Sequence, residues 1–106
     1  MNRIYKYHLS LGPAVADTGL YTTTNKFGIW EHDVDLPEGA SILSVKFVSG
    51  GLYFWASVNP DEHIITKYEF VTAYTGVDLP TWCNKSTHIG TVNSGPLIYH
   101  VFARTD

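Results

Sequence analysis

Histidine is the residue type in this chain best suited to chemistry, because imidazole titrates near neutral pH and binds transition metals. The sequence contains five histidines, namely His8, His32, His63, His88 and His100. A catalytic zinc site needs three convergent ligands and an open position, and the spacings HxH, HxxxH and HExxH are all missing. The sequence therefore predicts no metal site and no bound cofactor.

His88 and His100 lie in two consecutive segments that we expect to pair as strands. Pairing would bring the two imidazoles near each other, where they could bind an anionic ligand or act as a general base on a phosphoester. Histidines in a sheet are also commonly half-buried packing residues. We therefore include both residues among the predicted ligand-binding residues and predict no catalytic residue.

Acidic residues surround His32, in the order Glu31, His32, Asp33 and Asp35. Such a group suggests acid, base and carboxylate partners for hydrolysis, or a cation site. Successive side chains of an extended segment point to opposite faces, so the three carboxylates share one side and His32 points away. This spacing favours a solvated carboxylate stripe.

Signatures of covalent catalysis and of phosphate binding are missing from the sequence. Cys83 is the only cysteine, so it forms no internal disulfide, and it lacks the surroundings of a nucleophile. The chain contains no GxSxG elbow, no Walker loop and no GxGxxG. We interpret Cys83 as a small structural hydrophobe.

The stretch Ser41 to Val58, SILSVKFVSGGLYFWASV, predicts a β-hairpin that turns at Gly50 and Gly51. In that register one face is wholly apolar. The predicted pairs are Ser49 with Leu52, Phe47 with Phe54, Val45 with Ala56 and Leu43 with Val58.

The opposite face of this hairpin presents two large aromatic residues, Tyr53 and Trp55, with Lys46 opposite Trp55. Aromatic rings beside a cation form a stacking platform for a nucleobase, a nucleotide phosphate or a peptide. The other interpretation is that a further aromatic residue covers this face. The aromatic residue that covers the face would then be Trp30, Trp82 or Phe27.

Alternation of period two runs through most of the remaining chain, and almost nothing predicts a helix. The fold class predicted is all-β: a small antiparallel β-sandwich or partly open barrel of six to seven short strands, in a single domain over residues 1–106. A loop or hairpin insertion is predicted over residues 10–34, and a second loop over residues 73–85. The other predicted strands are Ile4–Leu9, Ile29–Val34, Ile64–Val71, His88–Val92 and Leu97–Ala103.

Composition narrows the classes of partner. Seven basic and ten acidic residues give a formal charge of -3, which argues against a duplex nucleic acid as partner. No segment approaches the roughly 20 apolar residues needed to span a bilayer, and the N-terminus lacks the apolar run of a signal peptide. With 44% hydrophobic and 14% aromatic residues, the chain is expected to be well folded, soluble and cytosolic.

Several strings occur in an order that resembles a family of short tailed-bacteriophage proteins of unknown function. The resemblance implies a compact single domain of viral origin that is expressed in the host cytoplasm, and it transfers no catalytic or binding residue. The chain departs from the family pattern between Leu9 and Asp35, where it is longer. The strings are IYKY (4–7), LPEGASILSV (36–45), FWASVNP (54–60), TG (75–76), HIGTV (88–92) and YHVF (99–102).

Three functions are compatible with these observations. The favoured one is a non-catalytic phage accessory protein that binds and sequesters a small nucleotide-like ligand, with a counter-defence role. The alternatives are a protein–protein interaction module that modulates a host or viral protein, and a small histidine-dependent phosphoesterase. A sandwich of this size also commonly forms a homo-oligomer. The ligand-binding residues predicted are Lys46, Tyr53, Trp55, His88 and His100.

Overall fold

The computed structural model describes residues 1–11 and 28–105 in full and the backbone of residues 21–26. These residues form eight β-strands and one short 3-10 helix. The predicted insertion over residues 10–34 lies partly outside this range, and its described part contains β2 and the start of β3. The elements are β1 (Arg3–His8), β2 (Tyr21–Lys26), β3 (Ile29–Pro37), β4 (Ser41–Val48), β5 (Gly51–Val58), β6 (Ile65–Tyr74), η1 (Thr81–Lys85), β7 (Thr87–Ser94) and β8 (Leu97–Thr105).

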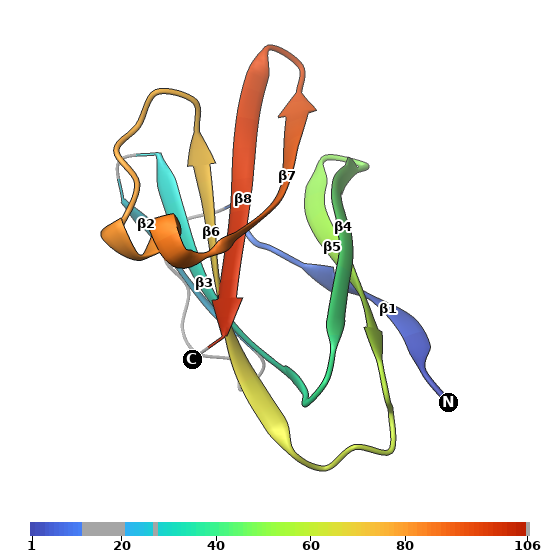
Figure 1. Cartoon of the computed structure of the whole chain (residues 1–106). Coiled ribbons are helices and arrows are strands. Elements are labelled where there is room, and N and C mark those ends of the chain that lie inside the picture. Colours follow the sequence, from blue (N-terminus) through green and yellow to red (C-terminus); the bar gives the residue numbers. More distant parts are fainter. Residues whose placement is uncertain (12–20, 27, 106) are drawn as a thin grey trace.

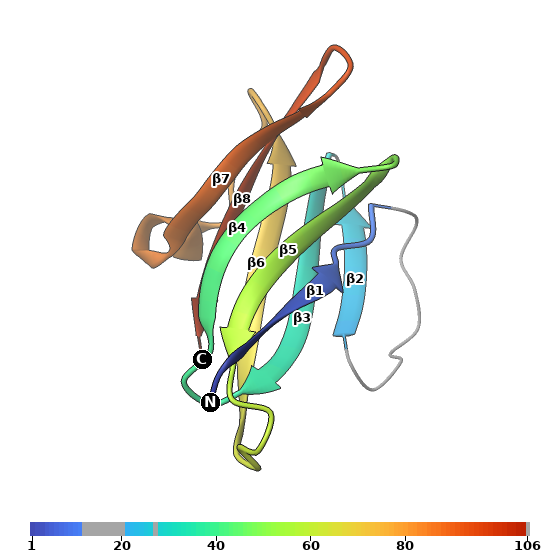
Figure 2. The ribbon, with the colours of Figure 1, turned by 90° about the vertical axis from the view of Figure 1, so that its right-hand side faces the viewer.

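The strands form two antiparallel sheets that pack face to face (Figures 1 and 2). One sheet has three strands in the order β1-β5-β4, and the other has five in the order β2-β3-β6-β8-β7. The sheets are separate, so the fold is a sandwich and not a closed barrel. The predicted small antiparallel all-β fold is confirmed.

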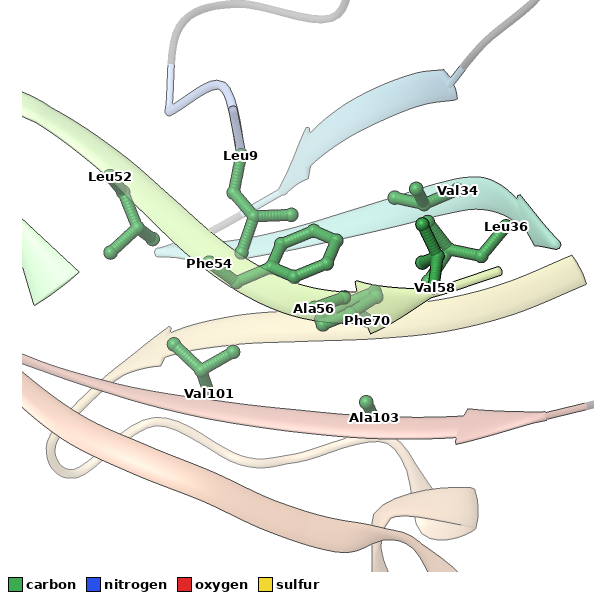
Figure 3. Close-up of a cluster of buried hydrophobic side chains, with 10 residues drawn as sticks. All are labelled: Leu9, Val34, Leu36, Leu52, Phe54, Ala56, Val58, Phe70, Val101 and Ala103. Carbon is green, nitrogen blue, oxygen red and sulfur yellow. The ribbon is translucent and has the colours of Figure 1, made fainter. Parts of the chain in front are cut away.

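The core lies between the two sheets and follows from strict alternation in the sequence. Every second residue of β5, from Leu52 to Val58, is buried, and β3 buries alternate residues from Trp30 to Leu36 in the same way. Phe54 stacks on Phe70 of the opposite sheet, with ring centroids 4.6 Å apart. Figure 3 shows side chains from both sheets converging in this layer. The layer removes one face of each sheet from solvent and leaves the two outer faces available for function.

The hairpin of β4 and β5 forms, but its predicted register is wrong by two residues. Phe47 pairs with Leu52, and the turn residues are Ser49 and Gly50, with φ angles of 50° and 82°. Positive φ at both central residues is the geometry of a type I′ turn, which matches the twist of the strands. Because the shift is even, the strand side chains from Ser44 to Val48 and from Leu52 to Val58 stay on their predicted faces.

Leu43 is a second correction in this hairpin. The sequence placed it on the apolar face opposite Val58, but the register shifts between Ile42 and Ser44, and Leu43 is 51% exposed. A β-bulge adds one residue to a strand and so breaks the alternation locally. Ile42 packs against the core at this point.

The two sheets approach closely along β4 and β7, an edge strand of each sheet. A Cβ added to Gly90 of β7 would lie 2.8 Å from Cγ1 of Val45 of β4, which is closer than carbon atoms pack. Both strands also carry an irregularity in register, β4 between Ile42 and Ser44 and β7 between His88 and Gly90. The missing side chain of Gly90 therefore permits the contact that closes this side of the sandwich.

Candidate functional site

The outer face of the three-stranded sheet presents two aromatic residues with basic residues on the strands to either side. Tyr53 and Trp55 lie on the central strand β5. Lys6 of β1 pairs with Trp55 and His8 with Tyr53, while Lys46 of β4 pairs with Tyr53 from the other side. We call Lys6, His8, Lys46, Tyr53 and Trp55 the lysine–aromatic face; Figure 2 looks onto this side of the sheet.

Direct contacts organise the Tyr53 end of this face. The Nζ atom of Lys6 lies 4.7 Å from the centroid of the Tyr53 ring, within the range of a cation–π interaction. The His8 ring lies 5.0 Å from the same ring at an interplanar angle of 34°. The Tyr53 ring folds over Gly51, since a Cβ there would be 2.8 Å from its Cε2 atom. The ring is thus held against the sheet with a cation beside it.

Lys46 lies opposite Tyr53, because of the shifted register, and not opposite Trp55 as predicted. The predicted covering of this face by Trp30 or Trp82 is wrong. Trp30 is buried, with Tyr74 and Tyr99 around it, and Trp82 stacks beneath the guanidinium of Arg104 at 4.4 Å. Phe27 lies outside the described residues.

Charge on the three-stranded sheet has a single sign. Strands β1, β4 and β5 together contain three basic residues, Arg3, Lys6 and Lys46, and no Asp or Glu. The whole chain has a formal charge of -3, so this sheet is a local exception. Surfaces of one sign raise the local concentration of ligands of the opposite sign. The lysine–aromatic face is therefore suited to an anion that also carries a flat ring.

His88 and His100 lie on the outer face of the five-stranded sheet, away from the lysine–aromatic face. Their ring centroids are 6.4 Å apart. Nδ1 of His100 lies 3.0 Å from Oγ1 of Thr91, and Nε2 of His88 lies 3.1 Å from the same oxygen. The five predicted ligand-binding residues thus fall into two groups on different sheets, so they do not form one site.

The carboxylates around His32 share one side of β3. Glu31, Asp33 and Asp35 all alternate away from the core, and Asp33 forms an ion pair with Lys67 at 3.5 Å. His32 is 1% exposed, and its Nε2 lies 3.2 Å from Oγ1 of Thr72. Burial, and secondarily the charge of His8, lowers the pKa of His32 to about 3, so its imidazole is neutral at pH 7. His32 is therefore a core residue and not a general base exposed to substrate.

Two further features limit the chemistry of the described chain. Burial, with the nearby Glu31, raises the pKa of the Cys83 thiol, so Cys83 is not an activated nucleophile. Among residues 1–11 and 28–105, no group of three His, Cys, Asp or Glu side chains is placed to hold a metal ion. In the same ranges, no helix has the length and apolar character needed to cross a membrane.

Lys6 and His8 belong to this face but are not among the predicted ligand-binding residues. Alternation along Ile4–Leu9 does place Lys6 and His8 on one side of a strand. The pairing of β1 with β5 joins residues about 50 positions apart, and no local pattern states it. The sequence signal that could have found these residues is a concentration of basic residues in segments that contain no acidic residue.

Comparison with known proteins identifies the family. A family model described as a domain of unknown function, DUF7352, matches residues 21–106. This chain belongs to that family. No curated protein and no solved structure showed a significant match.

Proposed function

We propose that this protein binds a small nucleotide-like ligand on the lysine–aromatic face and catalyses no reaction on that ligand. The observation that carries the proposal is the position of Tyr53 and Trp55 on a central strand, with Lys6 and Lys46 on the strands to either side. Within the described residues, neither lysine forms an ion pair that would compete for an anion.

The energetics suit a ligand that combines a base with phosphate. Stacking of a base on an aromatic side chain contributes about 1–3 kcal/mol. A hydrogen bond between a lysine and a phosphate oxygen is charge-assisted and contributes about 1.5–3 kcal/mol. The two lysines approach the aromatic row from opposite sides, which favours a compact ligand with one or two phosphates over an extended duplex.

Sequestration in an infected cell is the biological role that we propose for this binding. The support is the resemblance of the chain to short tailed-phage proteins, which implies expression in the host cytoplasm. A protein that binds a nucleotide signal without cleaving it lowers the free concentration of that signal by mass action. Binding of a host immune second messenger in this way constitutes a counter-defence activity.

Native mass spectrometry of the full chain tests the proposal directly. The protein is mixed separately with cyclic mononucleotides, cyclic dinucleotides and ADP-ribose derivatives. We expect one discrete mass addition that is released chemically unchanged on denaturation. Recovery of a cleaved ligand, or no addition across the panel, would contradict the proposal. The same spectra report the oligomeric state.

Substitutions on the lysine–aromatic face then test whether the ligand binds there. Tyr53→Ala and Trp55→Ala remove the stacking surface, and each should weaken binding by about 5- to 150-fold, corresponding to about 1–3 kcal/mol. Lys85→Ala, in η1, is the control for loss of a lysine elsewhere and should leave the affinity unchanged. Far-ultraviolet circular dichroism confirms that each variant keeps the fold. Wild-type affinity in both aromatic variants would remove this face from the proposal.

A protein partner is the second candidate for the same face, and one observation favours it. Ile4 of β1 and Leu43 at the β4 bulge are 64% and 51% exposed on the two edge strands that flank β5. Aromatic residues with apolar neighbours are typical of protein interfaces. Under this alternative the nucleotide panel gives no mass addition, and capture of a specific host protein is lost in Tyr53→Ala and Trp55→Ala.

A further inference from the structure

A chain of side-chain hydrogen bonds on the outer face of the five-stranded sheet resembles a nucleophile–base arrangement. Oγ1 of Thr75 lies 2.6 Å from Nε2 of His100, and Nδ1 of His100 lies 3.0 Å from Oγ1 of Thr91. Nε2 of His88 lies 3.1 Å from the same Thr91 oxygen. A hydroxyl within hydrogen-bonding reach of an imidazole whose other nitrogen is also held is the common geometry of activated hydroxyl nucleophiles.

The hydrogen bonds that link Thr75, His100, Thr91 and His88 can all be donated in the same order, from Thr75 towards His88. If Nδ1 of His100 carries the proton and donates to Thr91, then its Nε2 is free to accept the proton of Thr75. The Thr91 hydroxyl in turn donates to Nε2 of His88. The His88 ring packs on Phe102, with centroids 5.1 Å apart, which limits its movement. Thr91 and His88 therefore hold His100 in the tautomer that a general base requires.

A hollow of about 390 Å³ has Thr75 in its wall. Its lining is mainly apolar and consists of Tyr74, Thr75, Pro96, Leu97 and Ile98. Leu97 and Ile98 are 45% and 46% exposed at the start of β8, beside the end of β6 in Figure 1. The backbone N–H of Thr75 donates to the carbonyl of Ile98 at 3.3 Å, which fixes Thr75 at this wall. The hollow thus offers an apolar surface beside Thr75, which is an exposed residue.

We propose that Thr75 and His100 form a catalytic dyad for acyl transfer from small uncharged esters with an apolar acyl group. Among the residues whose side chains the structure describes, no Lys or Arg belongs to the hydrogen-bonded chain or to the wall of the hollow, so an uncharged ester suits the site better than a phosphoester does. This activity is separate from the nucleotide-binding proposal, because it uses the other sheet.

The reaction consists of two balanced steps. Oγ1 of Thr75 attacks the ester carbonyl carbon while its proton moves to Nε2 of His100, and the bond to the alcohol oxygen breaks as the alcohol takes that proton. The product is an acyl-Thr75 ester. Water then attacks the acyl carbon, gives a proton to His100 and releases the carboxylic acid. Return of that proton to Oγ1 restores Thr75.

Hydrolysis of p-nitrophenyl butyrate by the full-length protein tests the dyad. We expect release of p-nitrophenol with a mass addition of one butyryl group, which peptide mapping places on Thr75. Thr75→Val keeps the shape of the side chain and should abolish the addition, and His100→Asn should slow acylation by 100-fold or more. Thr87→Val, on the same strand as Thr91, is the matched control and should behave as the wild type.

Other outcomes would overturn the proposal. An addition that persists in Thr75→Val, on a histidine or lysine, would show that Thr75 is not the nucleophile. No turnover and no addition in the wild type would exclude the ester class. Thr91 is a positioning residue, so Thr91→Val should move the pH dependence of acylation as well as its rate; a rate change alone would assign it a structural role.

The same variants separate this inference from the proposed nucleotide site. Thr75→Val should leave nucleotide binding at wild-type affinity, and Lys6→Ala should leave ester hydrolysis unchanged.

Discussion

The two outer faces of the sandwich differ in how their charged groups are partnered. On the five-stranded sheet, Lys67 pairs with Asp33 at 3.5 Å, and Arg104 contacts Glu69 at 3.3 Å. On the three-stranded sheet, Lys6 and Lys46 border the aromatic row in strands that contain no acidic residue. The distribution of charge between the sheets, and not the total of -3, therefore indicates where an anionic ligand would bind.

Removing both lysines from the lysine–aromatic face should give the largest effect. Lys6→Ala with Lys46→Ala removes two charge-assisted contacts and should weaken binding of the identified nucleotide by about 100-fold or more. Isothermal titration calorimetry measures the change. The matched control is Lys67→Ala, which removes a lysine from the other sheet and should leave affinity within two-fold. An equal loss of affinity in the double variant and in Lys67→Ala would mean that only the net charge of the protein matters. The two faces would then not differ in their affinity for an anion.

A side chain added at the close contact between β4 and β7 should destabilise both sheets together. Gly90→Ala places a methyl group 2.8 Å from Val45 and should lower the free energy of unfolding by about 1–3 kcal/mol. Urea denaturation measures this change. In the double variant with Val45→Ala the clash is relieved, so Gly90→Ala should cost less there than in the wild-type background. Additive costs would show that Gly90 matters for another reason.

Lowering the pH should destabilise the core between the two sheets, where His32 is buried. The pKa of His32 is about 3 in the folded protein and near 6.5 when unfolded, so between these values only the unfolded chain gains this proton. Stability then falls as pH falls, by about 2 kcal/mol between pH 6.5 and pH 5. Urea denaturation at the two pH values should show a smaller loss in His32→Gln than in the wild type. Equal losses would contradict the role of His32.

The smallest effect should come from the paired charges of the five-stranded sheet. Asp33→Asn breaks the ion pair with Lys67, whose partners are 46% and 48% exposed, so the free energy of unfolding should fall by less than about 1 kcal/mol. Thermal denaturation at low and high salt measures it. A large loss would show that this pair is screened from water, and that the two faces differ less than the structure indicates.

Local patterns were sufficient to predict much of the fold. Alternation along β5 placed Phe54 in the core and Trp55 outside, and both positions are correct because successive side chains of a strand point to opposite faces. The hairpin itself was predicted from the paired glycines. Its register was not, since a turn at Ser49 and Gly50 competes with one at Gly50 and Gly51 over a difference that the local sequence does not resolve.

Only part of each candidate site could be predicted from the sequence. Tyr53, Trp55 and Lys46 share a hairpin, so their neighbourhood follows from short-range pairing. Lys6 joins them only because β1 adds to the far side of β5. Likewise His88 and His100 were expected to approach each other, but Thr75, in the turn that follows β6, joins them by long-range contact. Trp82 was misplaced because nothing local stated that η1 lies by β8.

The sequence by itself determined the all-β class, the face of most strand residues and the slightly negative net charge of the whole chain. These properties depend on composition and on a two-residue period, which are local. Only the tertiary structure decided that β1 pairs with β5, that Gly90 meets Val45, and that Thr75 reaches His100. These are contacts between residues far apart in the chain, and they are selected by the packing of the whole core rather than by any single segment.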